Sequence, residues 1–195
     1  MKGAYKITVP ATVFPITLAE AKQHLKVDFT DEDTLIDIYI KGATEYVEEH
    51  TGRALLPQTI QHVMNCFPES TSKNPNAVLY LYRPPVRTLN NLDYVDFEGN
   101  NQNYNIIDDI VLDITSEPAQ VARTGGNAWA TTAQQPGAVK LTYISGYNDA
   151  ANVPSPIRAA ILLLIGELYE RRENFVKSMP DAVGYLLAPY VIREF

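Results

Sequence analysis

The segment TDEDTLIDIYIKGATEYVEEHTG, residues 30–52, decides how the rest of the chain is interpreted. Its first turn holds three acidic residues, where the helix dipole favours negative charge, and Gly52 lies where a left-handed C-terminal cap is expected. Between them, apolar residues recur at helical spacing and form one stripe: Leu35, Tyr39, Gly42 or Ala43, and Tyr46, widened by Ile36, Ile40 and Val47. This pattern predicts an amphipathic helix over residues 30–50.

Two further helical regions flank this segment in the sequence. Before it, Thr17 and Glu20 have the spacing of a capping box, which predicts a short helix over residues 17–25. Near the other end of the chain, the motif PSP at residues 154–156 predicts an N-cap at Ser155, with proline in the first helical position. The helix that follows is apolar almost all round until Glu170, and a short last helix is expected over residues 181–188.

The middle of the chain changes to a period of two, which is typical of β-strands. Candidate strands lie between turn signals at residues 59–66, 78–82, 89–97, 110–115 and 139–143, and residues 117–137 are expected to form a long polar loop. The predicted fold class is therefore α+β. It consists of an extended arm over residues 1–15, a small helical bundle over 16–56 and 154–195, and an inserted β-rich region over 57–153. The insertion is expected to be a mainly antiparallel β-sheet or a small sandwich.

Composition excludes several classes of protein. A chain of 195 residues with 46% hydrophobic and 20% charged residues is typical of a folded domain rather than a disordered one. Its net charge of −7 argues against broad binding to DNA or to an anionic membrane. The single cysteine, Cys66, excludes an internal disulfide and a multi-cysteine metal site. Neither a secretory signal nor a membrane span is evident, so we expect a protein made in the cytoplasm.

No residues in the sequence carry a catalytic motif. His24, His50 and His62 lie far apart without ligand spacing, and no phosphate-binding loop, dinucleotide fingerprint or nucleophile elbow occurs. We therefore predict no catalytic, cofactor-binding or metal-binding residues. The twelve tyrosines suit a contact surface, or alternatively the edges of a sheet core, and five lie in predicted strands and turns: Tyr80, Tyr82, Tyr94, Tyr104 and Tyr147.

The order of these segments resembles the head–tail connector (portal adaptor, or head-completion) proteins of long-tailed bacteriophages and prophages. No single motif is specific, but the set occurs in the order of the family and covers nearly the whole chain. The resembling segments are ITLAEAKQHLKV at 16–27, DEDTLI at 31–36, YVEEHTGRAL at 46–55, RPPV at 83–86, LDYVD at 92–96, YISGY at 143–147, VP at 153–154, IRAAILLL at 157–164, LYERRE at 168–173 and LLAPY at 186–190.

The resemblance implies a structural virion protein that is not an enzyme and needs no cofactor. Such connectors form a homo-oligomeric ring under the portal protein, usually twelvefold, and extend the channel through which genomic DNA passes without sequence-specific binding. They also dock the next stopper or tail-completion protein. The resemblance places the protein in the neck of a virion, at the head–tail interface, after its synthesis in the cytoplasm of the bacterial host, and implies no membrane partner.

Within this family the C-terminal segment reaches the portal. The resemblance therefore implies partner-binding roles for Tyr190, Ile192, Arg193 and Phe195. Two alternatives remain open. One is another phage neck protein of the stopper or tail-completion type, and the other is a small enzyme of unknown type.

The excess negative charge is concentrated in one region. Residues 28–49 contain eight acidic residues and one lysine, and the remainder of the chain has equal numbers of acidic and basic residues. One hypothesis is that Asp37, Glu45 and Glu48 face a DNA channel, where negative charge keeps the passing genome from sticking. The other interpretation is an outward, solvated helix face, and the sequence leaves both open.

Overall fold

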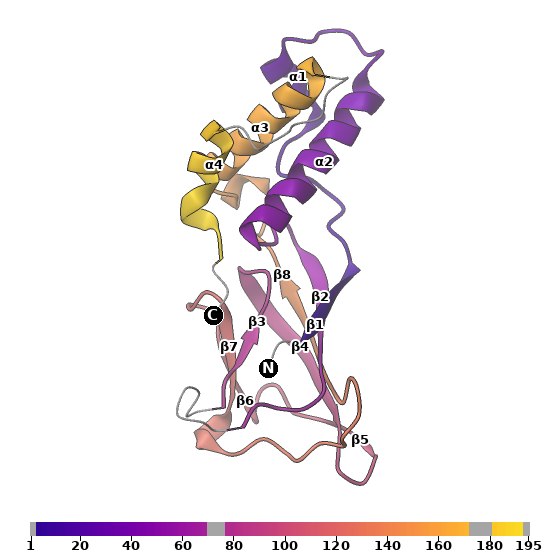
Figure 1. Ribbon diagram of the computed structural model, residues 1–195, viewed down its shortest axis with the longest axis vertical. Coiled ribbons are helices and arrows are strands. Elements are labelled where there is room, and N and C mark those ends of the chain that lie inside the picture. The colour runs from indigo at the N-terminus through magenta and orange to yellow at the C-terminus, as the bar shows by residue number, and fades with distance from the viewer. Residues whose placement is uncertain (1–2, 70–76, 172–180, 193–195) are drawn as a thin grey trace. The chain divides into compact units, whose positions relative to one another are not determined.

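A computed structural model describes residues 3–69, 77–171 and 181–192. Helices and antiparallel strands occupy separate parts of the chain, which confirms the predicted α+β class. The chain forms two compact units (Figure 1). We call Ala11–Leu56 with Tyr147–Phe195 the helical unit, and Met1–Pro10 with Pro57–Gly146 the sheet unit.

Four α-helices make up the described part of the helical unit: α1 (Leu18–Leu25), α2 (Asp33–Thr51), α3 (Ser155–Glu170) and α4 (Asp181–Leu187). Short 3-10 turns precede α3 at Ala150–Asn152 and follow α4 at Ala188–Tyr190. Helix α3 packs against the other three helices, and α2 and α4 flank it (Figure 1). Their buried sides share one core that is almost entirely aliphatic, including Ile36, Ile40, Val47, Leu55, Ile157, Ile161 and Ile165.

Local capping marks the start of α1 and the end of α2. The capping box is confirmed, because the Thr17 side chain accepts from the Glu20 backbone N–H while the Glu20 carboxylate accepts from the Thr17 N–H. Gly52 ends α2 in the left-handed conformation, as predicted, with a φ of 68°. The prediction of Ser155 as N-cap is wrong. The Pro154 carbonyl already accepts from the N–H groups of Ile157 and Arg158, so Ser155 is the first residue of the helix.

The sheet unit contains two antiparallel sheets. The larger has the strand order β1-β2-β8-β4-β5, and the smaller has the order β3-β7-β6. The strands are β1 (Ala4–Val9), β2 (Gln58–Met64), β3 (Leu79–Leu81), β4 (Val86–Val95), β5 (Asn101–Asn103), β6 (Ile110–Asp113), β7 (Ala119–Arg123) and β8 (Val139–Ser145).

Inward residues of both sheets form one core, so the sheet unit is a small sandwich. Along β2 and β8 buried residues alternate with more exposed ones, as expected when one face of a sheet is covered. The inward residues of both sheets belong to a single cluster, including Ile60, Leu81, Leu92, Ile110, Val121, Leu141 and Tyr143.

Two segments differ from their expected structure. Part of the expected arm, Ala4–Val9, forms edge strand β1, paired with β2 so that Tyr5 lies opposite His62. Part of the expected loop over 117–137, Ala119–Arg123, forms β7 at the centre of the smaller sheet. Both strands are short, and each is placed by pairing with a strand far away in the sequence, β1 with β2 and β7 with β3.

Candidate functional site

The C-terminal segment contacts the end of α2. The Nε of Arg53 donates a hydrogen bond to the carbonyl oxygen of Tyr190 at 2.7 Å, and the Ile192 N–H donates to the Thr51 carbonyl at 2.9 Å. Tyr190 and Ile192 are both half-buried. The two residues are thus held on the helical unit with part of their surface accessible to a partner. Arg193 and Phe195 lie outside the described residues.

The three acids predicted to face a channel are not equivalent. Asp37 and Glu45 are exposed on α2, and Glu45 makes only a long ion pair with Lys41, 4.0 Å from Nζ to Oε1. Glu48 is half-buried, and its Oε1 accepts the Leu55 backbone N–H at 2.7 Å. Glu48 therefore orders the turn after α2, whereas Asp37 and Glu45 present negative charge to solvent.

Other acidic residues of the helical unit form contacts between its helices. Asp33 at the start of α2 pairs with Lys22 of α1 at 2.5 Å. The Tyr169 hydroxyl of α3 donates to the Glu32 carboxylate at 2.5 Å. In α1, the hydrogen bond from the Thr17 backbone holds the pKa of Glu20 below its ordinary value, and the neighbouring Arg158 lowers it further. Part of the acidic excess is therefore structural.

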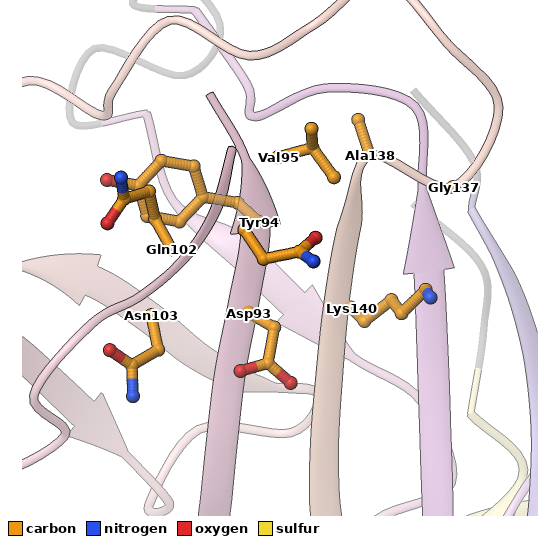
Figure 2. A pocket seen from close by; sticks show the side chains of 9 residues that line it. Asp93, Tyr94, Val95, Gln102, Asn103, Gly137, Ala138 and Lys140 are labelled. Carbon is orange, nitrogen blue, oxygen red and sulfur yellow. The ribbon is translucent and has the colours of Figure 1, made fainter. Parts of the chain in front are cut away.

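The sheet unit carries a polar hollow of about 390 Å³. Figure 2 shows it between β4, β5 and the segment that enters β8. Asp93 of β4 lies opposite Lys140 of β8 in register, and the Asn91 amide donates to Asp93 at 2.7 Å. Amides from β5, Gln102 and Asn103 among them, complete the polar lining. The hollow contains hydrogen-bonding groups and one charge of each sign, but its lining includes no histidine, cysteine or serine.

The inner side of the larger sheet contains a buried histidine. His62 is 2% exposed, and neither ring nitrogen has a hydrogen-bond partner among the residues that the structure describes. Its ring lies edge-on to Tyr82, with centroids 4.8 Å apart, and burial lowers its pKa to about 4. At neutral pH the imidazole is uncharged and acts as a packing group. Over the described ranges no three histidine, cysteine or acidic side chains converge in a way that would hold a metal ion.

The tyrosines singled out from the sequence fall mostly into the core. Tyr104 is buried and Tyr94 half-buried, both in an aromatic cluster with Phe67 and Trp129, whereas Tyr80 is 45% exposed. Tyr82 and Tyr147 are half-buried. Two further tyrosines lie exposed on the helical unit. Tyr46, which the periodicity placed in the apolar stripe of α2, is 42% exposed, and Tyr185, which sequence reasoning missed, is 81% exposed. A helical wheel would have placed Tyr185 opposite Val183 and Leu187, the buried residues of α4.

The family model described as phage gp6-like head-tail connector protein matches residues 15–81. No protein of curated function matches the chain. Because the matched residues include α1, α2, β2 and β3, the match spans parts of both units. The resemblance to head–tail connectors drawn from the sequence is thereby confirmed.

Three solved structures with a similar fold come from gene transfer agent particles. A chain in the virion of a native gene transfer agent (GTA) particle has 19% identity and a TM-score of 0.76, over 98% of this chain and 97% of that chain. A chain in the neck of a native GTA particle, computed with C12 symmetry, has 22% identity and a TM-score of 0.72, over 100% and 98%. A third, in the neck of an empty GTA particle computed with C6 symmetry, has 19% identity and a TM-score of 0.74, over 98% and 97%. The complete two-unit fold is thus shared with these chains.

Within the described segments, none of the helices has both the length and the apolar character that crossing a membrane requires.

Proposed function

We propose that this chain is a structural protein of the neck of a phage-like particle, where copies of it form a head–tail connector ring. The observation that carries this proposal is the family-model match over residues 15–81. The fold likeness to chains of GTA virions and necks extends the support to the whole chain. The role requires contact surfaces rather than a reaction, and we propose no enzymatic activity.

The proposed ring contains twelve copies and lies between two partners. One is the portal protein, contacted by the C-terminal segment that includes Tyr190 and Ile192. The other is a stopper or tail-completion protein. The neck of the native GTA particle computed with C12 symmetry supports the twelvefold count. The anchoring of Tyr190 and Ile192 at the end of α2 supports the contact with the portal, because it presents the segment from a fixed position.

Cryo-electron microscopy of the assembled neck tests the ring directly. We expect twelve copies of the fold to lie against the portal in one ring. Sedimentation of the purified protein, with and without its cognate portal protein, provides a second readout, and we expect rings only in the presence of the portal. The proposal would be contradicted by a neck that does not contain the chain. It would also be contradicted by a protein that remains monomeric in the presence of its cognate portal protein.

The channel-facing role of the α2 acids is a separate proposal. The exposure of Asp37 and Glu45 supports it, whereas Glu48 contributes a charge that is already engaged with the Leu55 N–H. If α2 lines the channel, the double variant Asp37→Asn/Glu45→Gln should slow DNA ejection, because the wall then repels the genome less. Adding Glu48→Gln, which keeps a hydrogen-bond acceptor, should slow ejection further.

A matched control removes two charges from the sheet unit. Glu98→Gln and Asp108→Asn are both exposed acids outside α2, and we expect this pair to leave the ejection rate unchanged. Equal ejection rates in wild type and in the α2 variants would exclude a channel role for these acids.

A further inference from the structure

The side of α2 that faces away from the helical core carries an apolar row. Ile38, Gly42 and Tyr46 follow one another four residues apart, so they align along the helix. Ile38 is 61% exposed and Tyr46 is 42% exposed. The opposite side of the helix supplies Ile36 and Ile40 to the core. Among the residues that the structure describes, this outer row is therefore left largely exposed.

Gly42 leaves a notch in that row. Glycine inside a helix is unfavourable relative to alanine, and a Cβ at Gly42 would meet nothing within 4 Å. Gly166 of α3 differs, because a Cβ there would lie 3.5 Å from the His24 imidazole. Nothing described in the chain therefore requires a glycine at position 42. A close approach from outside the chain would require one.

Tyr46 is held at one side of the notch. Its ring stacks on His50, one turn further along α2, with centroids 6.3 Å apart and an interplanar angle of 4°. Ile38 forms the other side, and β-branched side chains have few rotamers. The notch over Gly42 thus has two restrained walls, which lowers the entropy cost of filling it.

The same unit carries a projecting side chain on another helix. Tyr185 of α4 is 81% exposed, because Val183 and Leu187 occupy the buried side of that helix. Its exposed neighbours Ala182 and Ala188 are small, so the tyrosine stands out from its surroundings. Helix α3 packs against both α2 and α4, which flank it in Figure 1. The notch and the projecting tyrosine therefore lie on different sides of one unit.

We propose that Tyr185 of one copy packs over Gly42 of the next copy, between Ile38 and Tyr46, and that this contact closes the ring. The inference rests on the proposed ring. A cyclic assembly requires two different complementary patches on each subunit, repeated head to tail. The outer row of α2 and the Tyr185 face of α4 meet that requirement without a rearrangement of either helix.

Charge selects the second copy's α4, rather than its α2, as the occupant of the notch. Pairing two α2 faces would bring Asp37 and Glu45 of each copy together with only Lys41 to offset them, and like charges at an interface are unfavourable. The α4 helix carries a single charge, Asp181, in its first turn. The Tyr185 hydroxyl is also a hydrogen-bond donor for a carboxylate such as Glu45 at the edge of the row.

The small size of this contact is consistent with a ring that forms only on the portal protein. Stable complexes bury about 800 Å² on each partner, and one tyrosine in a three-residue notch covers much less. Isolated copies should therefore remain monomeric, and the portal would supply the alignment that makes twelve weak contacts act together.

Disulfide trapping in assembled necks tests the contact. Glu45→Cys, one turn along α2 from Gly42, and Ala182→Cys, one turn along α4 from Tyr185, are exposed positions beside the contact. They are introduced separately and together, with Gly42, Tyr185 and native Cys66 retained in every chain. After mild oxidation we expect the double variant to give a covalent ladder that reaches the full ring. Mixed single variants should give dimers at most, and each single variant alone should give no ladder.

A pair of alanine variants provides a second readout. Gly42→Ala and Gly166→Ala should each raise the melting temperature of the isolated chain by about 2–4 °C, because both remove a helical glycine. Only Gly42→Ala fills the notch, so we expect it to reduce ring formation at least tenfold, while Gly166→Ala leaves assembly at the wild-type level.

Two results would overturn the inference. One is the absence of a ladder in necks that contain the double variant in ring form, which would leave the connector role intact. The other is ring formation at the wild-type level by both the Gly42→Ala variant and the Tyr185→Ala variant. If the wild-type chain itself is absent from the neck, the proposed function fails, and this contact fails with it.

Discussion

The helical unit and the sheet unit are stabilised in different ways. The helical core is almost entirely aliphatic, α1 begins at a capping box, and α2 ends at a left-handed glycine. The sheet core contains a cluster of four aromatic rings in which Phe67 stacks on Trp129 at 4.6 Å and Tyr94 stacks on Tyr104 at 4.9 Å. The first unit thus depends more on local signals, and the second on contacts between residues far apart in the chain.

The two units also differ in charge. The helical unit has fifteen acidic and nine basic residues, a net charge of −6, whereas the sheet unit has eight and seven. Several acids of the helical unit act within it, as Glu48 does for the Leu55 N–H. Charge in this protein therefore serves both the internal fold and the exposed face of α2, and mutations can separate these two uses.

The largest expected effect comes from the aromatic cluster. Phe67→Ala should lower the free energy of unfolding by about 3–5 kcal/mol, because it removes a buried ring that contacts three others. Urea titration followed by the fluorescence of Trp129 measures it. Phe67→Leu, which keeps most of the volume, should cost much less. A loss below about 1 kcal/mol for the alanine variant would contradict the importance of this cluster.

His62 makes the sheet unit sensitive to acid. Its pKa is about 4 in the folded chain and about 6.5 in the unfolded chain, so the unfolded chain binds the proton more tightly. The contribution of uncharged His62 to the free energy of unfolding is fully present above pH 6.5. It decreases by up to about 3 kcal/mol as the pH falls towards 4. We expect His62→Leu to remove this part of the pH dependence of stability.

Ile60→Val on the same strand is the control for His62. Ile60 is buried on the same face of β2 and does not titrate. Its replacement should lower stability by about 1 kcal/mol at every pH. If His62→Leu shows the same slope between pH 6.5 and pH 4 as wild type, the histidine is not responsible for the acid sensitivity.

A smaller effect is expected at the start of α1. Thr17→Ala removes the side-chain oxygen that accepts the Glu20 N–H, and should cost about 1 kcal/mol. Thermal unfolding measures it, and Thr17→Ser, which retains the hydroxyl oxygen, should stay close to wild type. Equal losses in both variants would show that the methyl group of Thr17, rather than the cap, stabilises the helix.

The smallest expected effect is at the exposed face of α2. Asp37→Asn should change the free energy of unfolding by less than about 0.5 kcal/mol, because this side chain lies in solvent. Glu48→Ala should cost about 1–3 kcal/mol, because it leaves the Leu55 N–H without its acceptor. Chemical denaturation of both variants measures the difference, and equal effects would contradict the separation of structural from exposed acids.

Sequence reasoning identified the long helices and five strands, but the assembly surfaces only in part. It placed Asp37 and Glu45 correctly on one helix, yet included Glu48, whose role depends on the turn that follows α2. It left a contact surface and the edges of a sheet core open for Tyr94 and Tyr104, and both lie in the aromatic cluster of the sheet core. It overlooked Tyr185, because exposure depends on which side of α4 packs against α3.

The sequence by itself determined the helical unit, because apolar periodicity and caps such as Thr17 and Gly52 act over about one helical turn. It also determined that the middle of the chain is β-rich, because alternation is a local pattern. Only the tertiary structure decided the pairing of β1 with β2, the place of β7, and the burial of His62. These features join residues more than forty positions apart, such as Tyr5 with His62 and Leu79 with Val121. Such pairings depend on the packing of the whole unit, which no local pattern encodes.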